Sequence, residues 1–165
     1  ETDGIDLSVA YDADTTNGAW RVGAEATYIA SYELDDPQAG RLDGAGRRNF
    51  GNFATSTPEW RVNGFFGWER GNHGVNVFVR YIDSYVDDQV ALGQGPELFT
   101  RIDSQTTVDA QYTIRFDNER APVLAFGAIN LFDEDPPHVA TNGGYDSKVH
   151  DPRGRLLYAR ATFEF

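Results

Sequence analysis

The chain of 165 residues has no cysteine, no methionine and a single lysine, Lys148, among its fourteen basic residues. Without cysteine, neither a disulfide framework nor a thiolate metal site can form. No apolar run approaches the roughly 18 residues of a membrane-spanning helix, and no signal peptide is visible. The formal charge of −12 argues against nucleic acid as a partner, because nucleic acid attracts basic surfaces. The sequence opens on Glu1, so we expect its natural start to lie upstream.

What the sequence does contain is alternation of apolar and polar residues with period two. Val75, Val77 and Val79, for example, alternate with Asn76 and Arg80. Such alternation predicts strands with one apolar face. We expect seven of them, at about Gly4–Asp12, Ala19–Glu33, Glu59–Glu69, Val75–Ile82, Thr107–Phe116, Val123–Phe132 and Arg155–Phe165. The sixth is apolar on both faces, which leaves its orientation open.

Short and long connections alternate along the chain. The short ones, at Ala13–Gly18, Arg70–Gly74 and Asp117–Pro122, contain turn-forming residues. The long ones are Leu34–Pro58, Asp83–Thr106 and Asp133–Gly154. Outer-membrane β-barrels have short periplasmic turns and long extracellular loops. The rhythm therefore predicts an antiparallel transmembrane β-barrel, and a periplasmic C-terminus would place all three long connections outside.

Aromatic residues concentrate at the ends of the apolar faces and small residues lie between them. In the third segment Trp60 and Trp68 flank Gly64. Aromatic girdles of this kind mark the two membrane interfaces. Tyr112 is an exception, because we place it in mid-strand. A soluble β-sandwich, the alternative, would put its largest residues in the middle of each strand, where burial is deepest.

Seven strands cannot close a barrel in lipid, since the open edges would leave backbone groups unpaired. The missing part is one further strand, a much larger barrel, or another copy of the chain. The inward faces carry a balanced set of charges that suits each of these: Arg21, Arg61, Arg80, Arg115, Arg160, Glu25, Glu59, Glu69, Asp109 and Glu164.

The C-terminal quarter carries a more specific signal. Asn130, Leu131, Phe132 and Asp133 form an N-L-F-D segment, followed by acidic residues and prolines over 134–137. A G-Y-D element over 144–146, a run over 151–155 that ends in Gly154 and Arg155, and a last strand ending in Phe165 complete the set. In order and spacing this resembles the end of TonB-dependent outer-membrane receptors. Phe163 and Phe165 also resemble the barrel-assembly signal, although Ala159 and Arg160 depart from its upstream pattern.

The resemblance implies a 22-stranded barrel with an N-terminal plug in the outer membrane of a Gram-negative cell. Residues 1–165 would be the C-terminal part of the barrel domain, and the plug and its TonB-contacting segment would lie upstream. The implied function is uptake of a scarce ligand: a siderophore, cobalamin, haem or a carbohydrate. The implied partners are outer-membrane lipid, lipopolysaccharide, the TonB system and the barrel assembly machinery. A small or oligomeric structural or adhesive barrel is the alternative.

Candidate ligand-facing residues lie in the long connections. Arg47 and Arg48 could clamp a carboxylate or phosphate, and Asp87 and Asp88 could keep the outer surface hydrated. Loop aromatic residues could stack on a sugar or a siderophore, or pack on one another: Phe50, Phe53, Tyr85, Phe99 and Tyr145.

The three histidines give no clear chemistry. We interpret His73 as a solvated turn residue. His138 and His150 share the last long connection with several acids, a set that could bind a divalent cation, but their spacing matches no known ligand motif, so we predict no metal. No histidine lies on a predicted strand beside a serine, as a lipase triad would require. We therefore expect neither an enzyme nor a cofactor.

Overall fold

The structure is a computed structural model that describes residues 1–37, 40–49, 51–52, 55–88, 100–117, 122–140 and 143–163. No helix in this part of the chain is long and apolar enough to span a membrane. The strands are β1 (Thr2–Thr15), β2 (Gly18–Asp36), β3 (Gly40–Asp43), β4 (Arg47–Arg48), β5 (Trp60–Arg70), β6 (His73–Ile82), β7 (Tyr85–Asp87), β8 (Thr100–Ile102), β9 (Gln105–Arg115), β10 (Val123–Ile129) and β11 (Leu156–Thr162).

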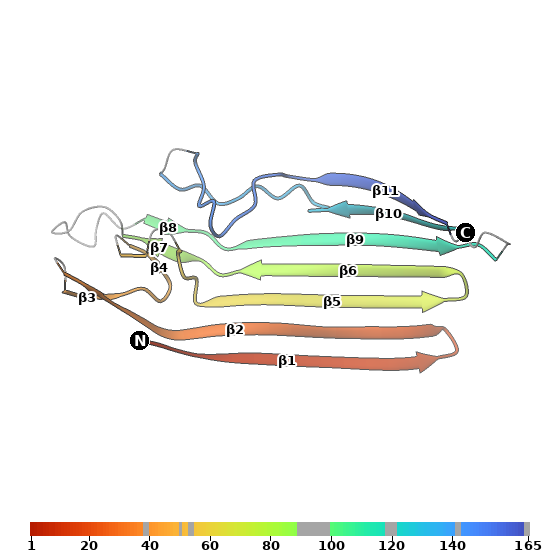
Figure 1. The fold of residues 1–165 in the computed structure, drawn as a ribbon, viewed down its shortest axis with the longest axis horizontal. Helices are drawn as coiled ribbons and strands as arrows, with labels where there is room; N and C mark the ends of the chain where they lie inside the picture. The colour runs from red at the N-terminus through yellow and green to blue at the C-terminus, as the bar shows by residue number, and fades with distance from the viewer. Residues whose placement is uncertain are drawn as a thin grey trace.

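One antiparallel sheet forms most of the molecule. Its strands follow the order β1-β2-β5-β6-β9-β10-β11, so each of these strands pairs with the next one of the seven along the chain (Figure 1). These are the seven predicted strands, and the prediction of an all-β antiparallel fold is confirmed. Within the described residues β1 and β11 form the two edges and the sheet does not close into a barrel.

The pairing register separates an apolar from a polar face. One row across the sheet reads Val9, Ala24, Gly64, Val79 and Val108, all on the apolar face. A parallel row on the other face reads Ser8, Glu25, Asn63, Arg80 and Thr107. These two rows confirm the predicted alternation.

The sixth predicted strand, β10, takes a definite orientation. Leu124 and Phe126 pair with Ile114 and Tyr112 and so lie on the apolar face. The register across β9 therefore resolves what the apolar sequence of β10 left open.

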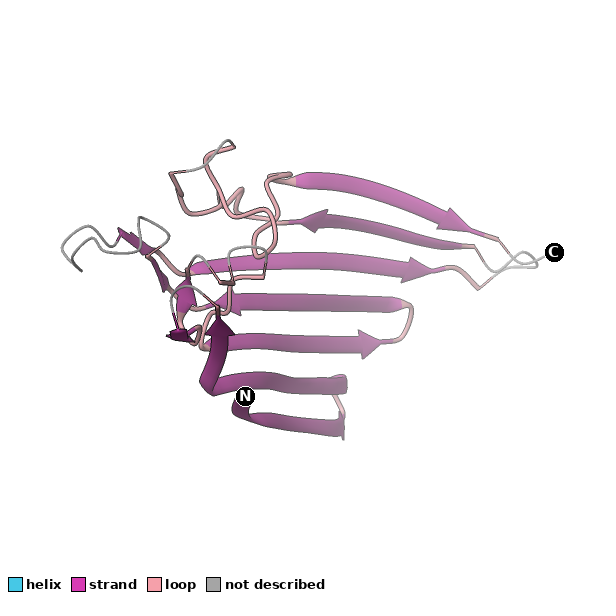
Figure 2. Ribbon diagram, turned by 60° about the vertical axis from the view of Figure 1, so that its left-hand side comes forward, coloured by secondary structure: helices cyan, strands magenta, loops and turns pink. Residues whose placement is uncertain are grey.

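The apolar face is uncovered. Ile5 is 57% and Tyr11 66% exposed, and Leu157 reaches 72%. A soluble sandwich would cover such side chains with a second sheet. Here the smaller sheet, formed by β4, β7 and β8, lies at one end of the main sheet (Figures 1 and 2).

The placement of Tyr112 in mid-strand is wrong. Pairings across the sheet put Trp20 beside Trp68, Trp68 beside Val75, and Val75 beside Tyr112. Phe126 follows in the same row. Tyr112 thus belongs to the aromatic band near the short turns. The sequence misplaced it because strand ends cannot be aligned with one another before the register is known.

Two of the long connections contain short strands that the sequence did not predict: β3 and β4 follow β2, and β7 and β8 follow β6. We call the long connections the first (37–59), second (83–104) and third (130–155) connections, and together the loop layer. Two predicted strands are shorter in the structure: β10 ends at Ile129 and β11 spans Leu156–Thr162. Glu164 and Phe165 lie outside the described residues.

The loop layer has a small apolar core of its own. Tyr85 and Ile102 from the second connection pack with Val139 from the third, and Val149 lies against them. Figure 2 shows the short strands at the end of the sheet opposite the β1–β2 and β5–β6 turns.

Candidate functional site

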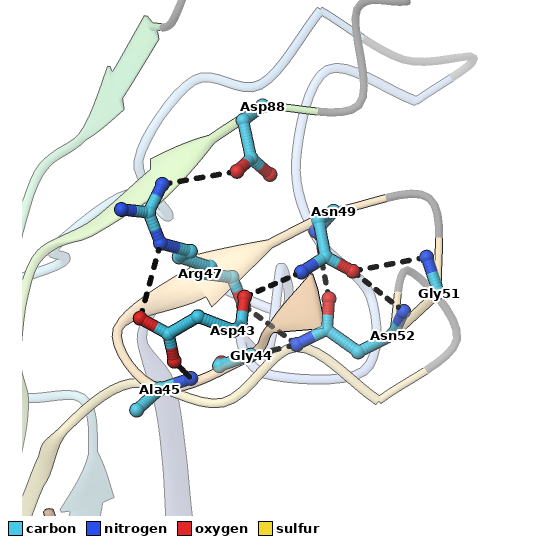
Figure 3. A network of polar contacts seen from close by, with 8 residues as sticks. All are labelled: Asp43, Gly44, Ala45, Arg47, Asn49, Gly51, Asn52 and Asp88. Atoms are coloured by element: carbon cyan, nitrogen blue, oxygen red, sulfur yellow. Dashed lines mark hydrogen bonds and ion pairs between the residues drawn. The ribbon is translucent and has the colours of Figure 1, made fainter. Parts of the chain in front are cut away.

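The first connection is shaped by two asparagines (Figure 3). The Asn49 side chain accepts hydrogen bonds from the amides of Gly51 and Asn52 at 2.9 and 3.0 Å, and its Nδ2 donates to the Asp43 carbonyl at 2.7 Å. Asn52 Oδ1 in turn accepts from the Asn49 amide at 2.7 Å. Asparagine favours such turns because its side chain can pair with nearby backbone. These bonds hold Asn49, which directly follows Arg47 and Arg48 of β4.

Each of the two predicted arginines forms an ion pair with one of the two predicted acids. Strand β4 pairs with β7 in parallel, with Arg48 beside Asp87. Arg47 Nη1 donates to Asp88 Oδ2 at 3.0 Å, and Arg48 Nη1 donates to Asp87 Oδ2 at 2.9 Å. Arg48 and Asp87 are both buried. The interpretation of Asp87 as a hydrated surface acid is therefore wrong, and contact of these four residues with a ligand stays a prediction.

Asp146 joins all three connections. Its Oδ2 accepts a hydrogen bond from Ser56 Oγ of the first connection at 2.6 Å and from Tyr85 OH of the second at 3.3 Å. Arg48 Nε lies 3.4 Å from the same oxygen. Asp146 itself belongs to the third connection and is buried. A buried carboxylate needs such partners to stay charged.

His150 extends this cluster down to the main sheet. Its Nε2 lies 3.2 Å from Tyr85 OH and its Nδ1 lies 2.8 Å from Gln105 Oε1, at the start of β9. Burial lowers the pKa of His150, although the charge of Asp146 acts in the opposite direction. Burial also raises the pKa of Tyr85, with Asp146 adding to the effect. We call Ser56, Arg48, Tyr85, Asp87, Gln105, Asp146 and His150 the buried polar cluster.

The two loop histidines do not share a site. Both ring nitrogens of His150 are engaged in the buried polar cluster, whereas His138 is exposed. Among the described residues no three His, Cys, Asp or Glu side chains are placed to hold a metal ion.

His73 is exposed, as interpreted, but it does not lie in the turn itself. It is the first residue of β6, its Nδ1 pairs with Tyr112 OH and its ring stacks on that of Tyr112.

The other predicted contacts fall in several places. Tyr145 is half-buried. Phe50, Phe53 and Phe99 lie outside the described residues. Phe163 is exposed beyond the end of β11. The roles predicted for these side chains stay predictions.

The N-L-F-D segment ties the third connection together at its base. Asn130 and Asp133 both have left-handed backbone, with φ of 50° and 60°, which asparagine and aspartate tolerate better than most residues. The Asn130 side chain pairs with the Glu134 backbone: its Nδ2 donates to the Glu134 carbonyl at 2.9 Å, and its Oδ1 accepts from the Glu134 amide at 3.0 Å. Asp133 Oδ1 accepts from the Arg155 amide at 2.7 Å, where β11 begins. Phe132 is exposed.

A pocket of about 390 Å³ lies beside this base, on the polar face of the sheet. Alternate residues of β6 and β9 line one side, and the returning third connection lines the other. The lining residues are Arg80, Ile82, Gln105, Thr107, Asp109, Ile129, Asn130, Val149, Asp151, Arg153, Gly154 and Leu156. Sequence reasoning missed the pocket, as well as Ser56 and Gln105, because they come together only through pairing distant in sequence.

Comparison with known families gives one match. The family model described as TonB dependent receptor-like, beta-barrel matches residues 1–131. The match includes Asn130 and Leu131 and ends before Phe132, so it rests mainly on strands outside the C-terminal motif. No curated protein and no solved structure matches the chain.

Proposed function

Since the chain belongs to the TonB-dependent receptor β-barrel family, we propose that it forms the ligand-facing wall of a transporter that takes up a scarce ligand. Members of this family lie in the outer membrane of Gram-negative bacteria and are transporters, not enzymes. The family also decides against a soluble β-sandwich, in agreement with the uncovered apolar face.

We propose further that the seven long strands are the last of a 22-stranded barrel that encloses an N-terminal plug. The two edge strands, β1 and β11, each need a strand partner in lipid, where unpaired backbone groups are costly. In this arrangement the apolar face contacts outer-membrane lipid and the polar face lines the interior. Lipopolysaccharide, the TonB system and the barrel assembly machinery are the partners that such a protein requires.

The loop layer is the single observation that supports ligand uptake most directly. Three long connections fold onto one another through the buried polar cluster at the end that would face outside. Beneath the third connection, the pocket opens on the polar face. An ordered layer above a lined pocket is what a receptor needs to select one ligand. Siderophores, cobalamin, haem and carbohydrates all fit this general description.

Uptake by cells tests the proposal. Cells that express the full-length receptor would be given labelled members of the four ligand classes, with and without a functional TonB. We expect one class to accumulate only when TonB is present. Accumulation that is equal without TonB, or no accumulation of any class, would contradict an energised transporter.

A further inference from the structure

The pocket beneath the third connection carries a chemical preference in its lining. Its charged residues number two of each sign, and they are paired with one another. Arg80 Nη2 lies 2.7 Å from Asp109 Oδ1, and Arg153 Nη2 lies 2.6 Å from Asp151 Oδ2. Among the described residues, the lining therefore carries no excess charge with which to select an anion or a cation.

The lining nevertheless offers both donors and acceptors. An anionic ligand would meet the guanidinium groups of Arg80 and Arg153 but also the carboxylates of Asp109 and Asp151, and like charges repel. A hydroxyl group both donates and accepts a hydrogen bond. A ligand with groups of this kind can therefore pair with both the guanidinium and the carboxylate groups of the lining.

Gln105 offers a donor that the protein leaves unused. Its side chain is 5% exposed, and its Nε2 has no hydrogen-bond partner in the described part of the chain. Its Oε1 is engaged by His150. A buried unpaired donor costs about 1–3 kcal/mol, so an acceptor supplied by a ligand would gain more from Gln105 than from an exposed side chain.

Four lining side chains are aliphatic, Ile82, Ile129, Val149 and Leu156, and Thr107, Asn130 and Gly154 complete the lining. Aliphatic side chains suit the C–H surface of a compact ring better than an ionic group, which would have to give up its water. The volume of about 390 Å³ lies within the range of roughly 300–1,000 Å³ found for small-ligand sites.

We propose that this pocket binds a neutral, hydroxyl-rich ligand, a segment of a few sugar units. The inference rests on the proposed uptake function and narrows its ligand from four classes to one. Gln105 donates to a sugar oxygen, the two ion pairs bond the remaining hydroxyl groups at the rim, and the aliphatic side chains cover the ring.

Binding to the purified full-length receptor tests the proposal. The probes are neutral trisaccharides (maltotriose, cellotriose and xylotriose) and, as an anion, citrate, followed by saturation-transfer NMR in a detergent without a sugar headgroup. We expect at least one trisaccharide to bind and citrate to bind more weakly. Stronger binding of citrate, or binding of no trisaccharide, would overturn the proposal.

Two neighbouring leucines provide a matched pair of variants. Leu156 lines the pocket and is 51% exposed, whereas Leu157 points to the apolar face and is 72% exposed. Leu156→Trp fills part of the pocket and should weaken trisaccharide binding by about tenfold or more. Leu157→Trp should leave it unchanged. Equal effects of the two substitutions would overturn the assignment to this pocket.

A separate variant tests whether the paired charges of the pocket exclude anions. Asp151→Asn removes one carboxylate and leaves Arg153 without its partner, so citrate binding should increase several-fold while trisaccharide binding changes little. No gain for citrate would contradict the proposal that paired charges exclude anions.

Two further results distinguish failure of the sugar inference from failure of the uptake proposal, and a free sugar from a lipid-linked one. TonB-dependent uptake of an iron chelate without sugar binding would overturn this inference and leave the proposed function standing. Purified lipopolysaccharide, added as a competitor, distinguishes a free oligosaccharide from a lipid-linked sugar. Competition that is lost in Leu156→Trp supports the same sugar chemistry with a lipid-linked source, and absence of competition supports a free one.

Discussion

The sheet leaves apolar side chains exposed, whereas the loop layer buries charged ones. On the sheet, Val9 and Tyr11 leave most of their surface exposed, whereas Arg48 and Asp146 in the loop layer are buried. The membrane provides the sheet with an apolar surrounding, so its apolar side chains need no cover from the protein. The loop layer lies beyond the strands and must enclose its own core.

Their means of stabilisation differ accordingly. The long strands are joined by continuous backbone ladders, such as the ten residue pairs between β5 and β6. The loop layer has short ladders, with two residue pairs between β4 and β7. Side-chain contacts around Asp146 connect segments that backbone pairing does not. The stability of the sheet should therefore depend on the apolar character of its lipid-facing side, and the stability of the loop layer on a few individual residues.

The largest effect is expected from Arg48→Met. It leaves Asp87 and Asp146 as buried carboxylates without their guanidinium, a change that costs about 3–5 kcal/mol when a buried ion pair is broken. The three connections should then separate. Hydrogen exchange of residues 130–155 in the full-length receptor would measure this. Arg153→Met, which removes an exposed pair, is the control and should leave the exchange nearly unchanged, because exposed ion pairs contribute little.

A charge on the apolar face should be the next most damaging change. Gly64 lies midway between Trp60 and Trp68 on β5, so Gly64→Arg places a guanidinium near the middle of the membrane. The expected cost is roughly 2–4 kcal/mol. Asn63→Arg places the same side chain on the polar face and should be tolerated. Thermal unfolding of both variants in bilayers compares the faces directly, and equal unfolding temperatures would contradict their assignment.

Acid should loosen the loop layer while the sheet stays intact. The pKa of His150 lies below its usual 6.5, mainly because burial disfavours the charged form. The charge of Asp146 raises this pKa, and the charge of Arg61 lowers it further. Stability from the neutral ring is present above pH 6.5 and is lost as the pH falls through the lowered pKa. Limited proteolysis of the connections at pH 7.5 and 5 would measure it. His150→Gln, which does not titrate, should show a smaller pH dependence.

The smallest effect is expected from Tyr112→Phe. The change keeps the ring in the aromatic band and removes the hydrogen bond to His73, for a loss of about 0.5–1.5 kcal/mol. Tyr112→Ala also removes the ring and should lower the unfolding temperature further. If both variants unfold like the wild type, the aromatic band contributes nothing at this position.

The sequence predicted the sheet well because each strand carries its own local signal. Alternation on β6, for instance, marks Val77 and Asn76 as belonging to opposite faces without knowledge of any partner strand. What it could not provide was the alignment between strands. Tyr112 was misplaced for this reason.

The candidate site was only partly predictable. Arg47, Arg48, Asp87 and Asp88 were recognised as candidate ligand-facing residues, but their pairing with one another was not predicted. Asp146 was noticed as part of the family motif and among the acids near His138 and His150, and Gln105 was not noticed. These residues gain their roles from contacts across 39 to 90 positions of sequence, which no local pattern records.

Alternating accessibility along one strand tests the central claim most directly. The chain has no cysteine, so single cysteines can be introduced along β6 of the full-length receptor in lipid bilayers and spin-labelled. Residues 75, 77 and 79 should collide with oxygen, which dissolves in lipid, and residues 76, 78 and 80 with a water-soluble nickel chelate. Access to the chelate at all six positions, or no alternation, would contradict a sheet with one face in lipid and one toward an aqueous interior.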